Sequence, residues 1–155
     1  MKSFARYWLP PLVWMALIWS MSSDPGSADN SAGPFAWIMT VLFPWATPAQ
    51  IELAHLAVRK LGHMIEYAIL AVLWFRTLYT GRRLPFTSSA LAALAISVAW
   101  AIADEFHQSF VPSRNASAFD VIFDSTGASL ALLAHRLRNT PFSKATSTVE
   151  SPLRG

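Results

Sequence analysis

Hydrophobic residues in this chain are gathered into long runs that short polar segments separate. Four runs approach the ~20 residues that a helix needs to cross the hydrocarbon core of a membrane, and they cover residues 4–21, 61–79, 86–103 and 117–134. A further run, residues 34–45, is bounded by prolines and is too short to cross. The pattern predicts an all-α membrane protein: a bundle of four transmembrane helices with a short interfacial or re-entrant apolar segment on the outer side.

The first run has two interpretations. Lys2 and Arg6 stand at its start, and prolines occupy its first turns, where missing backbone donors do least harm. A basic start, a short apolar run and then small residues also describe a cleaved signal peptide. The length of the run and its three tryptophans favour a retained span.

Residues 22–31 form a polar segment rich in turn-forming residues, and the short apolar run follows it. We expect residues 34–45 to lie in the membrane interface or to dip into the membrane and return. An apolar flap that packs over neighbouring helices is an equally good interpretation.

The second long helix has a well-defined start. Thr47 offers an N-cap hydroxyl, Pro48 suits the first helical position, and Gln50 completes a capping box. Gly81 is a suitable stop at the other end. A helix over residues 48–79 would be about 48 Å long and would exceed the ~30 Å hydrocarbon core, so its first turns should project beyond the bilayer.

Composition supports a membrane location. Of the 155 residues, 54% are hydrophobic and only 14% are charged, which is too apolar for an ordinary soluble surface. The pI of ≈ 9.7 does not indicate nucleic-acid binding, because the basic residues are scattered in small groups. The absence of cysteine excludes disulfides, thiolate metal sites, iron–sulfur clusters and cysteine nucleophiles.

The charged residues divide unevenly between the two sides that four spans define. Nine of the twelve basic residues fall on the side of both termini, whereas eight of the nine acidic residues fall on the other side. The positive-inside rule then assigns both termini to the cytoplasm. We expect residues 1–138 to form the membrane domain and the polar residues 139–155 to form a disordered cytoplasmic tail.

Ionisable and polar residues cluster where three of the spans meet the outer side. Such groups are expensive at membrane depth, so the cluster is a functional-site hypothesis by default. Within each helix most of them are three or four positions apart and therefore share one face. The second span contributes Lys60, His63, Glu66 and Tyr67; the third contributes Asp104, Glu105, His107 and Gln108; Arg114 lies in the loop, and the fourth contributes Asp120 and Asp124.

Several of these residues have a structural alternative. Arg59 suits an interfacial anchor, Tyr67 an interfacial aromatic, and His107 a satisfied polar residue at a helix end rather than a metal ligand. Asp120 stands at capping-box distance from Ser117, a role that is compatible with a place in the site. Four small residues are expected to allow close helix packing: Gly62, Gly127, Ala128 and Ala131.

The whole cluster also has a structural interpretation as a network that fixes helix register, with Lys60, His63 and Arg114 as counter-charges. The carboxylates resist this interpretation best, because an unpaired carboxylate at membrane depth is strongly unfavourable or becomes protonated. His63 and the carboxylates lack a compact metal motif such as H-E-x-x-H. We therefore assign no metal and no cofactor.

Two motifs carry a resemblance to a known family. The first is Lys60-x-x-His63-x-x-x-Tyr67, and the second is Asp104-Glu105-x-x-Gln108-x-x-Val111-Pro112-x-Arg114-x-x-Ser117-x-x-Asp120, followed by Gly127. Together they resemble the signature of the VanZ-like family of small bacterial membrane proteins, over residues 55–131. Where the family commonly has asparagine four residues after the last aspartate of the motif, this chain has Asp124, which adds a possible negative charge.

The resemblance implies a multi-pass protein of the bacterial inner membrane. The family's namesake is associated with low-level resistance to the glycopeptide antibiotic teicoplanin, which concerns the cell envelope and agrees with an outward-facing site. The resemblance supplies no reaction, so whether the chain is an enzyme stays open.

Three functions are compatible with these features. In the first, the site handles an anionic membrane lipid or a lipid-linked envelope precursor. Glu105 or Asp104 would act as general acid or base with His63 as proton partner, and Lys60 with Arg114 would hold a phosphate or carboxylate. The other predicted ligand contacts are Glu66, Tyr67, Gln108, Asp120 and Asp124.

The second function is ion or proton movement, and the third is a non-catalytic interaction module whose polar cluster is structural. Proton movement is the weakest of the three, because the spans show no polar relay near the cytoplasmic side. The sequence does not indicate the oligomeric state.

Overall fold

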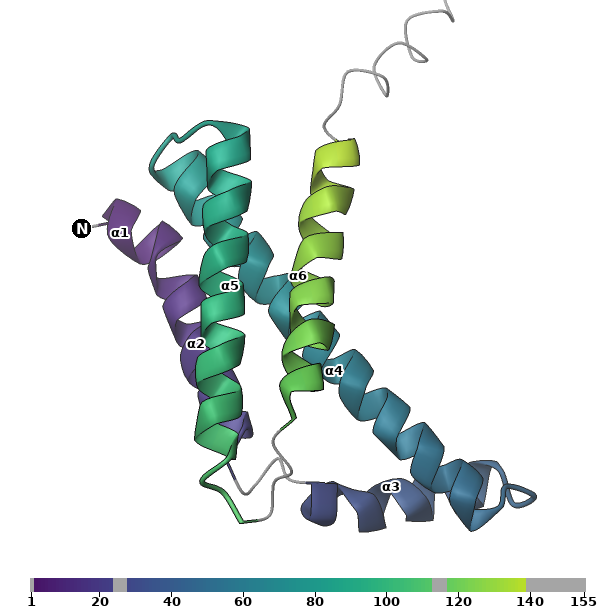
Figure 1. Cartoon of the computed structure of the whole chain (residues 1–155). Coiled ribbons are helices and arrows are strands. Elements are labelled where there is room, and N and C mark those ends of the chain that lie inside the picture. The colour runs from purple at the N-terminus through teal and green to yellow at the C-terminus, as the bar shows by residue number, and fades with distance from the viewer. Residues whose placement is uncertain (1, 24–27, 113–116, 139–155) are drawn as a thin grey trace, which may run out of the picture.

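The computed structural model describes residues 2–23, 28–112 and 117–138, and every regular element in this part of the chain is helical. The all-α prediction is therefore confirmed. Figure 1 shows α2, α5 and α6 extending along one axis, with α4 crossing them obliquely and α3 lying across one end. The elements are α1 (Lys2–Tyr7), α2 (Leu9–Met21), α3 (Ala28–Leu42), α4 (Pro48–Arg76), a π-helical turn η2 (Thr77–Gly81), α5 (Phe86–Gln108) and α6 (Ala118–Arg138).

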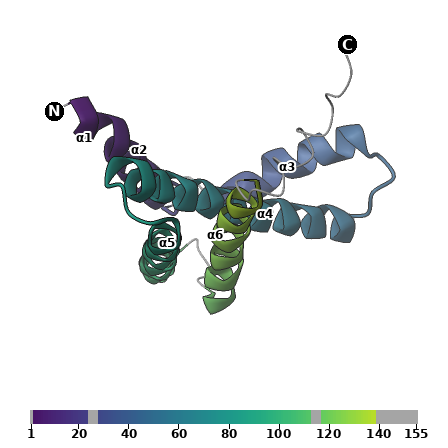
Figure 2. The ribbon, with the colours of Figure 1, turned by 90° about the horizontal axis from the view of Figure 1, so that it is seen from above.

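Helix α4 is the centre of the bundle. It contacts α2, α3 and α5, and it contacts α6 most extensively. Seen from above (Figure 2), α5 and α6 lie on one side of α4 and α3 lies on the other. The predicted capping box is present: Gln50 N donates to Thr47 Oγ1 at 3.3 Å, and Thr47 N donates to Gln50 Oε1 at 2.8 Å.

The first apolar run forms two helices rather than the single one that we expected. Pro10 and Pro11 have no N–H to donate to the carbonyls of Arg6 and Tyr7, so the α-helical ladder is interrupted there. The carbonyl of Tyr7 instead accepts from the Thr77 hydroxyl at 2.6 Å. This bond ties the end of α1 to η2.

The other helices also differ from the predicted boundaries. Helix α3 begins at Ala28, inside the predicted polar loop, and contains Pro34 within its length. Helix α5 continues through Asp104 to Gln108, and α6 continues to Arg138. The predicted spans ended where hydropathy falls. The helix itself continues, because the polar residues from Asp104 to Gln108 form the last turns of α5.

Apolar side chains cover much of the outside of the molecule. Phe106, Phe110 and Phe119 are 68–72% exposed, and only 22% of the most apolar 18-residue stretch of α5 is buried. Within the described residues, α5 is the one helix that is both long and apolar enough to cross a membrane by itself. Helices α4 and α6 carry the charged residues of the cluster, which lowers their mean hydropathy.

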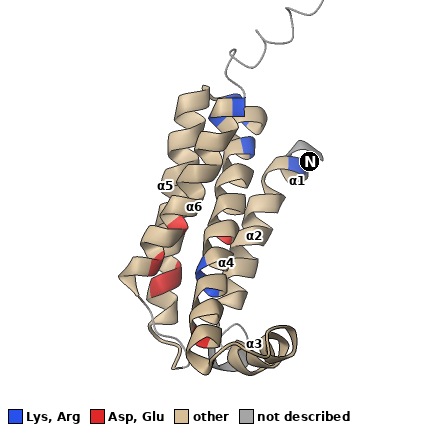
Figure 3. Ribbon diagram, turned by 90° about the vertical axis from the view of Figure 1, so that its right-hand side faces the viewer, with Lys and Arg blue, Asp and Glu red and all other residues tan. Residues whose placement is uncertain are grey.

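Charge separates along the bundle, as Figure 3 shows. Most of the described lysines and arginines gather at the end where α1 starts and α6 finishes, while the acidic residues lie in the other half together with Arg59 and Lys60 of α4. We call these the basic end and the acidic half. The basic end contains six arginines whose side chains the structure describes: Arg6, Arg76, Arg82, Arg83, Arg136 and Arg138.

Gly127 allows the closest approach between α4 and α6. A Cβ atom at this position would lie 2.1 Å from the backbone oxygen of Met64, which no real contact permits. The predicted packing role of Gly127 is therefore confirmed, and Ala128 beside it is fully buried. The same prediction is wrong for Gly62, because a Cβ there would meet nothing within 4 Å.

Gly127→Ala is expected to destabilise the protein by ~1–3 kcal/mol, because α4 and α6 must move apart to admit the methyl group. The measurement is the unfolding transition of the detergent-purified protein. Gly62→Ala is the matched control and should retain the wild-type transition or exceed it, since alanine favours a helix interior. Equal transitions for Gly127→Ala and the wild type would contradict the observed packing.

Candidate functional site

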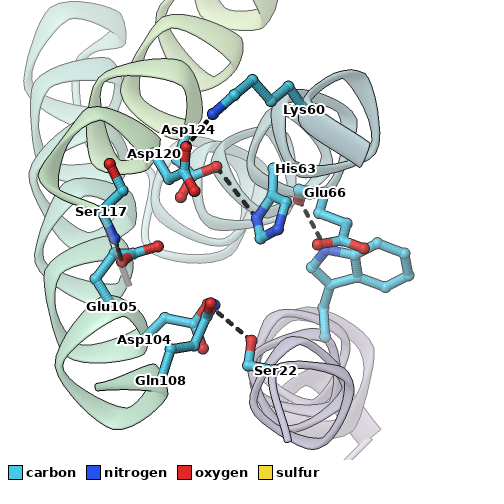
Figure 4. Close-up of polar contacts among 11 residues, drawn as sticks. Ser22, Lys60, His63, Glu66, Asp104, Glu105, Gln108, Ser117, Asp120 and Asp124 are labelled. Carbon is cyan, nitrogen blue, oxygen red and sulfur yellow. Dashed lines mark hydrogen bonds and ion pairs between the residues drawn. The ribbon is translucent and has the colours of Figure 1, made fainter. Parts of the chain in front are cut away.

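Polar side chains from α2, α4, α5 and α6 converge on one region in the acidic half (Figure 4). Most of the residues that the sequence predicted for the site lie here. The carboxylates of Asp104 and Asp124 are each 1% exposed, and Gln108 and Glu105 are 4% and 8% exposed. The network therefore lies inside the bundle rather than at its surface.

Two pairs join α4 to α6. The Lys60 ammonium forms an ion pair with Asp120 Oδ1, and it lies 4.6 Å from the centre of the Phe123 ring. Further along both helices, His63 Nδ1 lies 3.6 Å from Asp124 Oδ1. Lys60 and His63 are three residues apart on α4, and Asp120 and Asp124 are four residues apart on α6. Either spacing is about one helical turn, so the two pairs lie one turn apart along both helices.

Asp104 joins α5 to the N-terminal part of the chain. Its Oδ2 atom accepts from the Ser22 hydroxyl at 2.8 Å and from Gln108 Nε2 at 3.0 Å. Ser22 follows directly after α2 and is 4% exposed. Sequence reasoning missed this residue, since it counted Ser22 as part of a polar loop; the one available signal was a hydroxyl at the end of an apolar run.

Glu105 joins α5 to the start of α6. Its Oε2 atom accepts from the backbone N–H of Ser117 at 2.7 Å, while Ser117 Oγ accepts from Phe119 N at 3.3 Å. In a capping box a carboxylate three residues into the helix would bind that first N–H. Here the Glu105 carboxylate of α5 binds the Ser117 N–H in place of Asp120, and the Asp120 carboxylate pairs with Lys60 instead.

The four remaining predicted residues differ in their surroundings. Tyr67 is fully buried in the core, which rules out the interfacial alternative. The Glu66 side chain is half-buried, and its backbone oxygen accepts from Trp14 Nε1 at 2.9 Å. The His107 ring stacks on Trp19 at 4.1 Å between centres, but its buried Nδ1 atom has no hydrogen-bond partner among the described residues, so the expectation of a satisfied polar residue is wrong for this atom. Arg114 lies outside the described residues.

Three buried oxygen atoms have no hydrogen-bond partner among the described residues: Tyr67 Oη, Asp104 Oδ1 and Asp124 Oδ1. Such atoms are unfavourable unless a bound group or a proton satisfies them. Within the same part of the chain, no three His, Asp or Glu side chains are arranged to hold a metal ion. Asp104 Oδ1 and Asp124 Oδ1 are therefore each able to accept a further hydrogen bond or a proton.

A pocket of ≈ 440 Å³ opens beside the network, between α5 and α6. Glu105 and Ser117 contribute its polar part, and Ile102, Phe106 and Val121 contribute apolar walls. Ile102 and Phe106 in its lining are 56% and 68% exposed, so the pocket opens onto an apolar surface.

The fold and the site together define a class of protein: a helical bundle with a buried network of carboxylates and an apolar outside. The model of the VanZ/LLP1 family matches residues 7–139, and the chain belongs to this family. The resemblance carried by the two sequence motifs is thereby confirmed, and with it a VanZ-like membrane protein. Neither the curated proteins nor the solved structures contain a significant match to the chain.

Ser22→Ala is expected to lower the free energy of unfolding by ~1.5–3 kcal/mol, because it removes a hydrogen bond to a buried carboxylate. Ser109→Ala is the matched control; its hydroxyl donates to the Phe106 carbonyl at 2.6 Å at an exposed position, so the change should stay within ~0.5 kcal/mol. The readout is chemical unfolding of the purified protein in detergent. Equal losses in the two variants would show that Ser22 does not support Asp104.

The Lys60–Asp120 pair can be tested by a double-mutant cycle. Lys60→Met and Asp120→Asn should each destabilise the protein, and the double variant should recover at least ~1 kcal/mol of the summed loss, because it leaves no uncompensated charge. Arg136→Met, at the far end of α6 from Asp120, combined with Asp120→Asn is the control and should be additive. Additivity in both cycles would mean that the ion pair does not contribute to stability.

Proposed function

We propose that this chain is a multi-pass protein of the bacterial inner membrane, with an outward-facing polar site that handles an anionic lipid or a lipid-linked cell-envelope precursor. The observation that carries the proposal is the buried network that joins α2, α4, α5 and α6 beneath an apolar surface. A bundle with a polar interior and an apolar surface is more stable in a lipid bilayer than in water.

The lengths of the helices support four spans. Helix α5 has 23 residues and α6 has 21, which corresponds to about 34 Å and 31 Å and matches the ~30 Å core. Helices α1 and α2 together make the first span. Ile18 of α2 is 3% exposed within the core, and Ser22 binds Asp104, which supports a first segment that is retained in the bundle.

The orientation follows from the separation of charge. The positive-inside rule places the basic end, with both termini, in the cytoplasm. The network in the acidic half then faces the outer leaflet, and α3 lies across that end, in keeping with an interfacial segment.

The site offers two kinds of contact to an amphipathic ligand. A phosphate or carboxylate would be held by Lys60 and Arg114, and it would take the place of Asp120 beside the Lys60 ammonium. Hydroxyl or amine groups of the same ligand would donate to the buried oxygens of Asp104 and Asp124. Tyr67, Glu66 and Gln108 line the same network.

Acid–base chemistry at the site is assigned to Glu105 and Asp104, with His63 as the proton partner. Glu105 is the best placed of the three, because it lines the pocket between α5 and α6 and so reaches a ligand that enters from the bilayer. A general acid or base must lie within hydrogen-bond reach of the proton that it transfers.

A specific observation favours a second candidate, the non-catalytic interaction module. Lys60, Asp104 and Glu105 each make an inter-helix contact, as a purely structural network requires. Ion or proton movement has weaker support, because the network occupies only the acidic half.

Glu105→Gln keeps the size of the side chain and removes its charge. In a strain that depends on the chain for its phenotype, we expect sensitivity to glycopeptide antibiotics to rise to that of a strain without the gene, with a change in membrane lipid composition. Protein levels must match the wild type. Glu52→Gln, at an exposed position near the start of α4, is the control and should leave both readouts unchanged.

The outcomes separate the candidates. Wild-type sensitivity and lipid composition in Glu105→Gln at matched protein levels would refute the proposed function. A loss that follows the protein level in the Lys60, Glu105 and Arg114 variants would favour the interaction module. Flux through proteoliposomes no greater than through empty liposomes would exclude transport.

A further inference from the structure

A second polar pocket lies at the basic end, away from the network. It has a volume of ≈ 490 Å³ and is formed where α4 and η2 meet the start of α5 and the last turn of α6. Arg76, Tyr79, Thr80 and His135 contribute its polar atoms, and Val72 and Phe75 contribute apolar surface. Neither the family resemblance nor the proposed outer site involves these residues.

The charge that the described residues place at this pocket is positive. Residues 2–23, 67–103 and 125–138 contain no aspartate or glutamate, and they supply Arg76 to the pocket and five more arginines to the same end. An anion that binds here would therefore meet a positive potential and would not have to displace a carboxylate of the described residues. This distinguishes Arg76 from Lys60, which Asp120 already neutralises.

An apolar stripe runs along α4 to the pocket. Ile65, Ile69 and Val72 are 58%, 36% and 38% exposed and share one helix face with Arg76. The eleven-residue step from Ile65 to Arg76 corresponds to about 16 Å, close to half of the ~30 Å hydrocarbon core. The stripe thus covers the depth of one leaflet and ends at a cation.

The rim of the pocket is held in place by contacts with the N-terminal helix. Thr77 donates to the Tyr7 carbonyl at 2.6 Å, and the Arg76 guanidinium lies 5.5 Å from the Tyr7 ring centre. Gly81 approaches the same ring so closely that a Cβ would lie 3.1 Å from it. These contacts position η2 before any ligand binds, which lowers the cost of binding.

We propose that this pocket binds the phosphate headgroup of an anionic phospholipid, with one acyl chain along the Ile65–Val72 stripe. Arg76 would hold two phosphate oxygens, and the hydroxyls of Tyr79 and Thr80 would donate to the others. Basic pockets between transmembrane helices on the cytoplasmic side recognise lipid headgroups in this way. The inference rests on the proposed membrane insertion and orientation, but not on the outer site.

Native mass spectrometry of the full chain, released from nanodiscs of phosphatidylglycerol and phosphatidylcholine, tests the inference. The wild type is expected to retain phosphatidylglycerol selectively. Arg76→Gln should reduce that retention at least about fivefold, as expected for one arginine at a lipid headgroup. Arg138→Gln removes a charge from the same end outside the pocket and should change retention less than about twofold.

A second pair of variants leaves Arg76 intact. Thr80→Glu puts a negative charge on the exposed rim and should abolish the selectivity, whereas Ser88→Glu, exposed at the same end but outside the pocket, should not. Glu105→Gln should retain the lipid as the wild type does, so that a failure of the outer site and a failure of this pocket are told apart.

Three results would overturn the inference. Equal losses in Arg76→Gln and Arg138→Gln would show attraction to the whole basic end rather than to a pocket. Wild-type retention in Thr80→Glu would place the lipid elsewhere. Inorganic phosphate that displaces the lipid and stays bound in its place would identify a site for a small anion.

Discussion

The arrangement of the helices depends on the need of buried carboxylates for partners on other helices. Asp104 and Asp124 are almost completely enclosed, and a carboxylate in such a place is strongly unfavourable without hydrogen bonds or a counter-charge. Asp104 receives a hydroxyl from Ser22, while Asp124 faces His63. Ser22 directly follows α2 and His63 belongs to α4, so these contacts join α5 to the end of α2 and α6 to α4.

Much of the fold could be predicted because hydrophobic runs and helix caps are local signals. The start of α4 at Pro48 followed from three adjacent residues, and the capping box has the expected hydrogen bonds. Hydropathy did not show the division at Trp8, because that division comes from Pro10 and Pro11, which lack N–H donors inside an apolar run. The contact that satisfies the Tyr7 carbonyl could not be predicted, because its donor, Thr77, lies seventy residues away. The end of α5 was also missed, since hydropathy cannot show that Asp104 is buried.

The candidate site was predictable in its membership and not in its connections. Their spacing predicted that Lys60 and His63 share one face of α4 and that Asp120 and Asp124 share one face of α6. In the structure these two faces meet, with Lys60 beside Asp120 and His63 beside Asp124. The contacts of Ser22 with Asp104 and of Glu105 with Ser117 join residues on different elements. A single sequence carries no signal for such contacts.

Helix α4 connects the two ends that the proposals treat separately. Its part in the acidic half carries Lys60 and His63, its part at the basic end carries Arg76, and Gly127 of α6 lies against it between them. Because the helices touch backbone to backbone there, neither can shift by much without breaking that contact. A rearrangement of the network when a ligand binds would therefore have to rotate side chains, such as Lys60 away from Asp120, rather than slide α4 past α6. The basic pocket, whose walls include parts of the same two helices, would keep its shape while the network in the acidic half exchanges partners.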